Sequence, residues 1–139
     1  MGMAGRPSLA KSARMDAIAR NDVSPRTARR VLVVEDDRDT RELLVEALRM
    51  EGYEVAAAPD GVQALEHARR VQPHVILLDL MMPVMSGWEF RAMQTRDPSL
   101  SSVPVIVMSA FSDTLAGTAS VPKPFDIDEM VDAIRRCAA

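Results

Sequence analysis

Five short apolar runs, separated by segments with helical patterning, constrain the fold of this chain more than any other feature. Each run is about as long as a strand, and the first, at 31–34, is the β-branched kind that becomes a strand buried on both faces. The other runs are at 53–57, 75–78, 103–108 and 118–121. Strands that alternate with helices are joined by right-handed crossovers, so this order predicts a parallel sheet with helices on both faces.

The segments between the runs carry helix start and stop signals. Asp60 with Gln63, and Asp126 with Glu129, have capping-box spacing, and Gly52 stands just past the end of the first helix. A third helix is expected at 88–95, and 111–116 leaves room for one or two turns only. The apolar positions with helical spacing are Leu43, Leu44, Ala47 and Leu48, then Val62, Leu65 and Ala68, and finally Ile127, Met130, Val131 and Ile134. We therefore predict a flavodoxin-like, doubly wound α/β sheet of five strands in the order 2-1-3-4-5, with an abbreviated fourth helix.

Charge divides the chain into a basic tail and an acidic body. Residues 1–30 hold seven Lys or Arg against two Asp, a balance of +5, whereas residues 31–139 hold ten against eighteen Asp or Glu, a balance of −8. We assign 1–29 to a flexible N-terminal extension, helical at most over 9–20, and 30–139 to one domain. The acidic body argues against nucleic-acid binding, and a solvated extension is the simpler interpretation of the tail.

The sequence contains no recognisable membrane or secretion signal. Its longest apolar stretches, at 75–78 and 80–85, fall short of the roughly 18 residues of a membrane helix, and the Arg-rich start lacks the apolar core of a signal peptide. The single cysteine, Cys137, can form no internal disulfide. We therefore expect a cytoplasmic protein.

Polar residues follow four of the five apolar runs. The predicted strand order would gather them at one edge of the sheet, where neighbouring strands are about 4.8 Å apart. These residues are Glu35, Asp36, Asp79, Ser109 and Lys123. Carboxylates this close raise one another's pKa values unless a cation joins them, and oxygen-only ligands favour Mg²⁺. The sequence thus indicates a magnesium site at this edge.

Four segments at the predicted strand ends resemble the receiver domain of bacterial response regulators. They are Val33-Val34-Glu35-Asp36-Asp37, Leu78-Asp79-Leu80-Met81-Met82-Pro83 with Gly87, Met108-Ser109-Ala110 and Lys123-Pro124-Phe125. Each is weak alone, but four in this order are specific, and the resemblance covers about residues 30–138. It implies a two-component phosphorelay in which Asp79 takes a phosphoryl group, as an acyl phosphate, from a histidine kinase or histidine phosphotransfer protein.

The resemblance also implies how the site would hold its metal. Asp36 and Asp79 would ligate Mg²⁺ directly, Glu35 would do so through water, and Met81 would contribute its backbone carbonyl. The metal would neutralise the incoming phosphoryl oxygens. Mg²⁺ is therefore the expected cofactor.

Two further residues would act on the phosphoryl group itself. Lys123 would place a fixed positive charge beside its oxygens, and Ser109 would offer a hydroxyl that moves toward them. The family's Lys-Pro bond is cis, so the bond between Lys123 and Pro124 is expected to be cis as well. Reorientation of Ser109 is the expected switch.

Other polar and aromatic residues near these segments have structural interpretations. Asp37 is expected to cap the first helix, and His67 and His74 flank the second helix without the spacing of metal ligands. Trp88 and Phe90 are expected to contribute to the core. None of these residues is assigned to the site.

The chain departs from the family in its last third. Thirteen residues separate Ser109 from Lys123, fewer than is usual, and Ser120 replaces the aromatic that swings inward when the hydroxyl residue moves. Another readout, such as the first helix or the tail, is therefore needed. Met81 and Phe111 flank the route of hydrolytic water and cannot orient it by hydrogen bonding, so we expect slow self-dephosphorylation.

Four functions are open at this point. The leading one is a stand-alone receiver that acts as a phosphoacceptor and not as an enzyme. A phosphatase with an aspartate nucleophile, like the haloacid dehalogenases, would need a carboxylate where Met81 stands. A flavodoxin-like cofactor site would have its phosphate repelled by Glu35, Asp36 and Asp37. A binding module that keeps the pocket but signals without phosphorylation is the alternative favoured by the missing aromatic.

Overall fold

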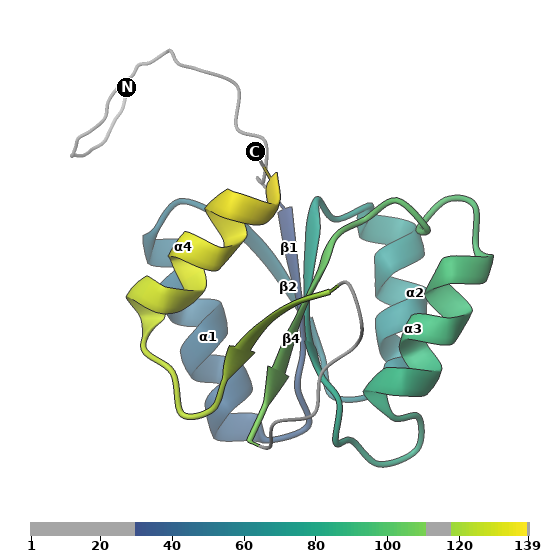
Figure 1. The fold of residues 1–139 in the computed structure, drawn as a ribbon, viewed down its shortest axis with the longest axis horizontal. Coiled ribbons are helices and arrows are strands. Elements are labelled where there is room, and N and C mark those ends of the chain that lie inside the picture. The colour runs from purple at the N-terminus through teal and green to yellow at the C-terminus, as the bar shows by residue number, and fades with distance from the viewer. Residues whose placement is uncertain (1–29, 111–117, 139) are drawn as a thin grey trace.

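The computed structural model describes residues 30–110 and 118–138 and shows an α/β fold (Figure 1). In chain order its elements are β1 (Arg30–Val34), α1 (Arg38–Met50), β2 (Glu54–Ala58), α2 (Gly61–Val71), β3 (Val75–Asp79), α3 (Gly87–Arg96), β4 (Val105–Ser109), β5 (Ala119–Pro122) and α4 (Ile127–Ala138). The strands are all parallel, and their order across the sheet is β2-β1-β3-β4-β5. The predicted fold class and strand order are confirmed.

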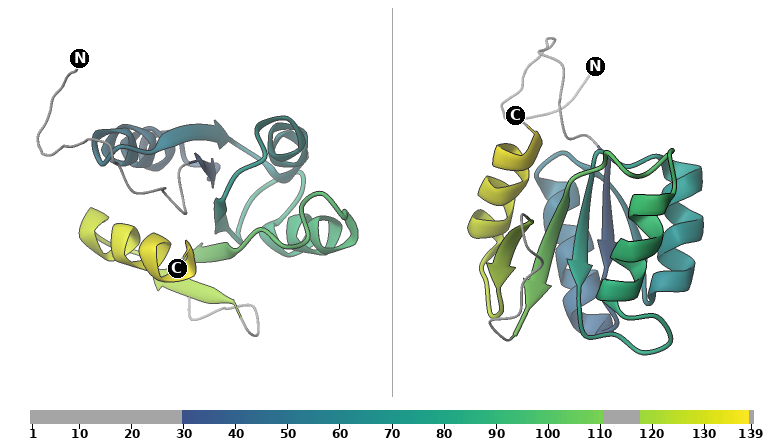
Figure 2. Two further views of the ribbon diagram at one scale, coloured as in Figure 1. Left: turned by 90° about the horizontal axis from the view of Figure 1, so that it is seen from above. Right: turned by 45° about the vertical axis from the view of Figure 1, so that its right-hand side comes forward.

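Helices cover both faces of the sheet. α1 and α4 lie against one face and α2 and α3 against the other, as the view from above in Figure 2 shows. Successive residues of β1 point to opposite faces, so Val31 and Val33 pack on the side of α1 and α4, while Leu32 and Val34 pack on the side of α2 and α3. All four are fully buried. The continuous apolar run therefore reflects two cores, one on each face.

The buried stripes of α1 and α2 do not include every apolar position with helical spacing. Leu44 and Leu48 are buried, but Leu43 has 66% of its surface exposed. Val62 is also exposed, at 52%, although it is apolar and three positions before the buried Leu65. The reason is that the stripe of α2 follows the spacing i, i+3, i+4, i+7 from a different start, through Gly61, Ala64, Leu65 and Ala68.

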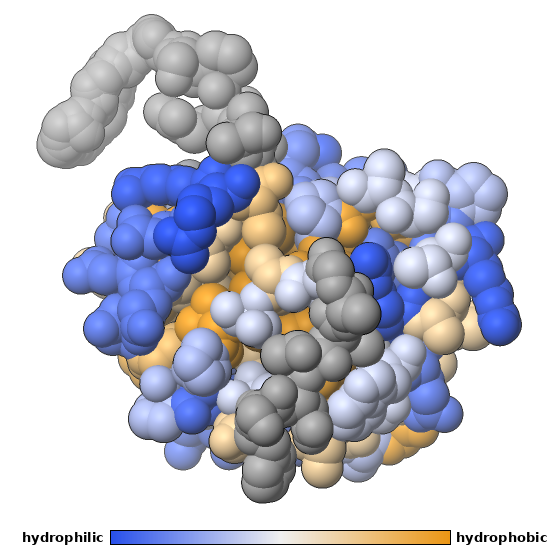
Figure 3. Space-filling view, in the orientation of Figure 1, coloured by the Kyte–Doolittle hydropathy of each residue, from blue (hydrophilic) through white to orange (hydrophobic). Residues whose placement is uncertain are grey.

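Helix α4 packs largely as predicted. Met130, Val131 and Ile134 are buried, whereas Ile127 is only partly so. Figure 3 shows hydrophilic side chains over the outer side of this helix and an apolar seam where it meets the sheet. The amphipathic pattern of the sequence thus accounts for its position on the sheet.

One of the two predicted capping boxes is complete. Asp126 N–H donates to Glu129 Oε1 at 3.0 Å, and Glu129 N–H donates to Asp126 Oδ1 at 2.9 Å. Asp60 accepts from Gln63 N–H at 2.9 Å, but the Gln63 side chain also donates to Asp60 instead of accepting from its backbone. Asp60 is therefore an N-cap without the reciprocal bond.

Strand β4 begins at Val105, two residues later than predicted. The buried side chain of Gln94 contacts the residues before this strand, because its Nε2 donates to the Val103 carbonyl at 3.0 Å and to the Leu100 carbonyl at 2.8 Å. The loop before β4 is thus held by Gln94 of α3 and, at Pro104, by a hydrogen bond from Ile76 N–H of β3 at 3.0 Å.

Three predictions concern residues outside the part of the chain that the structure describes. They are the extension at 1–29, the short helix at 111–116 and the place of Phe111. Within the described residues, every helix is too short or too polar to cross a membrane.

Candidate functional site

Three carboxylates converge at the carboxyl ends of β1 and β3. Glu35 and Asp36 follow β1 directly, Asp79 ends β3, and the two strands are neighbours in the sheet. One carboxylate oxygen from each residue lies within 4.8 Å of those of the other two. Glu35 and Asp79 are only 1% and 4% exposed, whereas Asp36 is exposed, so this acidic cluster opens to solvent at Asp36.

Burial and mutual repulsion perturb the acidic cluster. Burial, followed by the negative charge of Glu35, raises the pKa of Asp79 to about 7. The hydrogen bond from Met81 N–H to Asp79 Oδ1, at 3.1 Å, and the charge of Lys123 oppose this increase in pKa without cancelling it. A divalent cation would remove the repulsion, and carboxylate oxygens are the donors that Mg²⁺ prefers. The residues of the cluster therefore fit a magnesium ion.

Lys123 brings positive charge to the cluster from the segment after β5. Its Nζ donates to Glu35 Oε1 at 2.6 Å and lies 3.7 Å from Asp79 Oδ2. Burial alone would lower the pKa of Lys123, but the hydrogen bond and charge of Glu35, with the charges of Asp79 and Asp36, raise the pKa overall. Lys123 is therefore a permanent cation whose nearer partner is Glu35. Its peptide bond to Pro124 is cis, as predicted.

Ser109 and Met81 complete the set that the sequence analysis assigned to the site. Asp79 is in register with Met108, which places the buried Ser109 one residue further along the neighbouring strand. Met81 contacts Asp79 through its N–H, and its side chain is 52% exposed. The roles expected for the Ser109 hydroxyl and the Met81 carbonyl stay predictions.

Gly87 lets the first turn of α3 pack directly against the backbone of Asp79. A Cβ at this position would lie 2.5 Å from the Asp79 carbonyl oxygen and 2.6 Å from Leu80 Cα. Gly87 N–H also donates to the Leu80 carbonyl at 3.0 Å. Because both neighbours are backbone atoms, they cannot move aside without displacing Asp79. Gly87, which the sequence analysis grouped with the segment around Asp79, is therefore required by this close approach of the two backbones.

The loop between β3 and α3 contains a strained residue. Val84 has φ 68°, and Met85 N–H donates to the Pro83 carbonyl at 2.7 Å, so the three residues form a γ-turn of the rare positive-φ type. A β-branched residue with positive φ is an outlier, and the Val84 side chain is 81% exposed. The strain therefore lies in the loop that follows Asp79.

Two features near the site were not anticipated from the sequence. Ser86 and Glu89 form a complete capping box at the start of α3, and the Ser-x-x-Glu spacing could have revealed it. Arg41 Nη1 donates to the carbonyls of Glu35 and Asp36, at 2.9 and 3.3 Å. No sequence signal distinguishes Arg41 from the other arginines, because the contact depends on the path of the turn between β1 and α1.

Asp37, His67 and His74, for which the sequence predicted structural roles, each contact a backbone group. Asp37 caps α1 by accepting from Thr40 N–H at 2.9 Å. His74 Nδ1 accepts from Arg30 N–H at 3.1 Å, and His67 Nδ1 lies 3.1 Å from the Ala57 carbonyl. Both histidines thus bind backbone groups beside the sheet. Among the aromatics, Phe90 is fully buried and Trp88 is 39% exposed.

The model of one protein family, described as the response regulator receiver domain, matches residues 31–135. The chain therefore belongs to this family. Receiver domains are typically phosphoacceptors rather than conventional enzymes, and such a domain implies a cognate histidine kinase.

The chain is also similar to individual response regulators. The chain is 38% identical over 114 residues to the DNA-binding response regulator MtrA of Mycobacterium tuberculosis, and 39% identical over 114 residues to the response regulator MprA of Mycobacterium leprae. Each alignment covers 76% of this chain and 49% of the relative, so the chain spans about half the length of these curated relatives. Among solved structures, the chemotaxis protein CheY4 of Vibrio cholerae superposes with a TM-score of 0.74 at 27% identity, covering 79% of this chain and 98% of that one.

Proposed function

We propose that Asp79 accepts a phosphoryl group from a phosphohistidine, carried by a histidine kinase or a histidine phosphotransfer protein, with Mg²⁺ as cofactor. The proposal rests on the buried Asp79 carboxylate, which lies among two further carboxylates and 3.7 Å from Lys123. An Asp79 oxygen would attack phosphorus and form a P–O bond as the P–N bond breaks, and the imidazole would leave with the electron pair of that bond. The product is an acyl phosphate on Asp79.

The chain's own residues suit the stabilisation of the transferred group. Lys123 already lies close to Asp79 and would need only a small movement of its flexible side chain to contact phosphoryl oxygens. Ser109, at the end of the neighbouring strand, would donate its hydroxyl to the same oxygens. Mg²⁺, when bound, would neutralise their charge, and the residues proposed to hold it are Glu35, Asp36, Asp79 and the Met81 carbonyl.

An apolar pocket beside Lys123 suits the approach of the phosphoryl donor. It encloses about 520 Å³ between the first half of α1 and the segment that follows β5. Leu44, Phe125 and Ile127 line it, as does Leu43, which is 66% exposed. A donor helix that buried these apolar side chains would carry its phosphohistidine to the opening of the acidic cluster. We therefore include this pocket in the proposed function as the donor's contact.

Incubation of the full chain with acetyl phosphate and Mg²⁺ tests the proposal. Mass spectrometry should detect an adduct of about 80 Da, which disappears in Asp79→Asn and when Mg²⁺ is chelated. Asp37→Asn is the matched control, because it makes the same chemical change at an exposed helix cap outside the acidic cluster and should keep the adduct. An unmodified wild-type chain, or an adduct that persists in Asp79→Asn, would contradict the proposal.

A binding module that works without phosphorylation is a second candidate, and one observation favours it. Ser120 is exposed in β5, in register with Val107, where the family is expected to carry its switch aromatic. A chain that failed to take up a phosphoryl group, yet retained the same protein partners with and without phosphodonor, would support this candidate over the first.

A further inference from the structure

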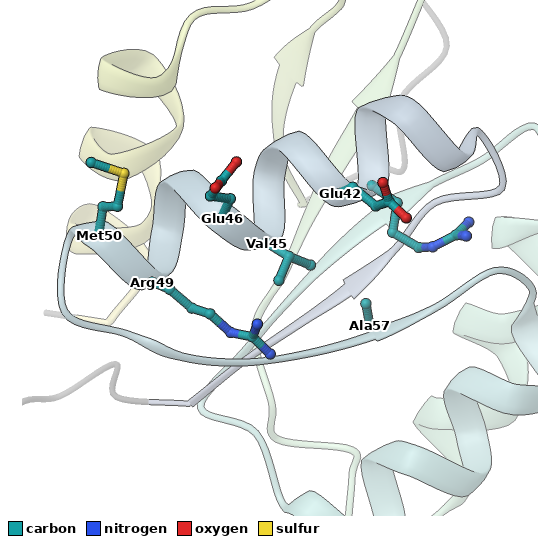
Figure 4. Close-up of a pocket in the computed structure, with 7 residues that line it drawn as sticks. Glu42, Val45, Glu46, Arg49, Met50 and Ala57 are labelled. Carbon is teal, nitrogen blue, oxygen red and sulfur yellow. The ribbon is translucent and has the colours of Figure 1, made fainter.

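Helix α1 carries an arginine near each end that donates to backbone carbonyls outside the helix. Figure 4 shows the groove beneath α1, in which Arg49 reaches from the helix toward β2 and Val45 points toward Ala57. The groove encloses about 630 Å³, and Arg41 lines it together with these residues. Arg49 Nη2 donates to the Val55 carbonyl at 3.2 Å, near the start of β2 and away from the acidic cluster. Arg41 instead reaches the turn between β1 and α1.

Arg41 binds the backbone of the two residues that bring carboxylates into the site from β1. Its Nη1 donates to the carbonyl oxygens of Glu35 and Asp36, at 2.9 and 3.3 Å. Within the described residues, no carboxylate forms an ion pair with Arg41, so the guanidinium is engaged through these carbonyls. Each carbonyl carbon is bonded to the Cα that carries the carboxylate side chain. One guanidinium nitrogen therefore anchors the main chain at the two residues from which these carboxylate side chains of the acidic cluster extend.

The Glu35 side chain is fixed from its other end as well. Asp37 N–H donates to Glu35 Oε2 at 3.1 Å, and Lys123 Nζ donates to Glu35 Oε1 at 2.6 Å. Asp36 is exposed, and among the described residues its carboxylate makes no hydrogen bond or ion pair with another side chain or with the backbone. Among the described residues, the hydrogen bond from Arg41 to the Asp36 carbonyl, at 3.3 Å, is therefore the contact that anchors the main chain from which the Asp36 carboxylate extends.

We propose that Arg41 is a positioning residue of the Mg²⁺ site, an inference that rests on the proposed function and adds a residue to it. Arg41 acts on the ligands through their backbone and contacts neither carboxylate. Residues that orient metal ligands from outside the coordination shell typically change metal affinity by about 10- to 100-fold when they are replaced. Because Arg41 orients two ligands through the main chain, its loss should weaken Mg²⁺ binding by about tenfold.

The charge of Arg41 taken alone predicts the opposite result. A guanidinium near a cation site repels the cation, so a neutral replacement would tighten Mg²⁺ binding if Coulomb repulsion dominated. Loss of positioning weakens binding instead. The direction of the change in the Mg²⁺ dissociation constant therefore separates the two effects without any need for an accurate magnitude.

Calorimetric titration of the full chain with Mg²⁺ tests the inference. Arg41→Gln should raise the dissociation constant about tenfold, and Arg41→Lys, which keeps the charge and can reach one carbonyl, should raise it less. Arg49→Gln is the matched control, because it removes a guanidinium–carbonyl bond from the same helix and groove at the far end. Arg49→Gln should lower the urea midpoint of unfolding and leave the dissociation constant within about twofold of wild type.

Two results would overturn the role of Arg41 while leaving the proposed function intact. One is wild-type or tighter Mg²⁺ binding in both Arg41 variants, and the other is an equal loss of affinity in Arg49→Gln. If Arg41→Gln does not fold, Arg41→Lys decides the matter, because a dissociation constant equal to that of wild type counts against positioning. A wild-type chain that binds no Mg²⁺ would overturn both the proposed function and this inference.

Discussion

Replacement of Asp79 by asparagine should stabilise the metal-free protein, and the gain should grow between about pH 4 and pH 7. In the folded chain, burial and then the charge of Glu35 raise the pKa of Asp79 to about 7, whereas an aspartate in the unfolded chain has a pKa near 3.9. The unfolded state therefore releases this proton first as the pH rises. The stability contributed by Asp79 is complete below about pH 4 and is lost as the pH rises through 7.

The size of the effect follows from the difference of about three pKa units. At about 1.4 kcal/mol per unit, the full loss is about 4 kcal/mol of unfolding free energy, most of it between pH 4 and pH 7. Solvent screens little of this, because Asp79 is only 4% exposed. Asparagine keeps the shape of the side chain without its charge, and Lys123 keeps its 2.6 Å bond to Glu35. The advantage of Asp79→Asn in unfolding free energy should therefore increase by about 3 kcal/mol from pH 4.5 to pH 8.

Urea unfolding in the presence of a chelator measures this advantage, with Trp88, the only tryptophan, as the fluorescent probe. Asp37→Asn is the control, because hydrogen bonds from Thr40 lower the pKa of Asp37 and its contribution is lost as the pH falls, the opposite direction. Mg²⁺ should reduce the advantage of Asp79→Asn by stabilising the wild-type fold. An advantage that is the same at both pH values would refute the reasoning.

Three further predictions concern the segments that follow β3 and β4 in the chain. Gly87→Ala should lower the unfolding free energy by about 2 kcal/mol and slow adduct formation, because its Cβ would meet the backbone of Asp79. Gly61→Ala is the control, since its Cβ would meet the flexible side chain of Met85, and urea unfolding should show a smaller loss of unfolding free energy. Val84→Gly should raise the unfolding free energy by about 1 kcal/mol by relieving the positive φ of an exposed side chain, so a lower value would contradict the strain. Met81→Asn with Phe111→Glu should speed loss of the acyl phosphate, followed by mass spectrometry, and unchanged decay would show that water access is not limited there.

The strand order and the acidic cluster were predictable because they depend on local signals. Each strand is a short apolar run, and the polar residues that follow Val34 and Leu78 mark the edge of the sheet where parallel strands end. The helix caps at Asp37 and Asp126 depend on residues three positions apart, which a sequence shows directly. These features need no knowledge of distant contacts.

The features that escaped prediction depend on residues brought together by folding. Val62 has an apolar side chain, but only the packing of α2 on the sheet shows that Ala64 belongs to the buried stripe instead. The positive φ of Val84 has no signal in a residue type that usually avoids it. The pairing of Lys123 with Glu35, closer than with Asp79, depends on the geometry of three strand ends.

The ion pair between Glu35 and Lys123 has a consequence for the protein's synthesis, because its partners are 88 positions apart in the chain. A nascent chain that ends before Lys123 already carries Asp79 and the two acidic residues after β1, but it lacks the cation that balances them. Contacts between residues far apart in the chain form slowly, because the entropy cost of closing the intervening loop comes first. Competence for phosphorylation should therefore appear only after the ribosome has released Lys123, which follows β5, so that a kinase meets no partly made acceptor.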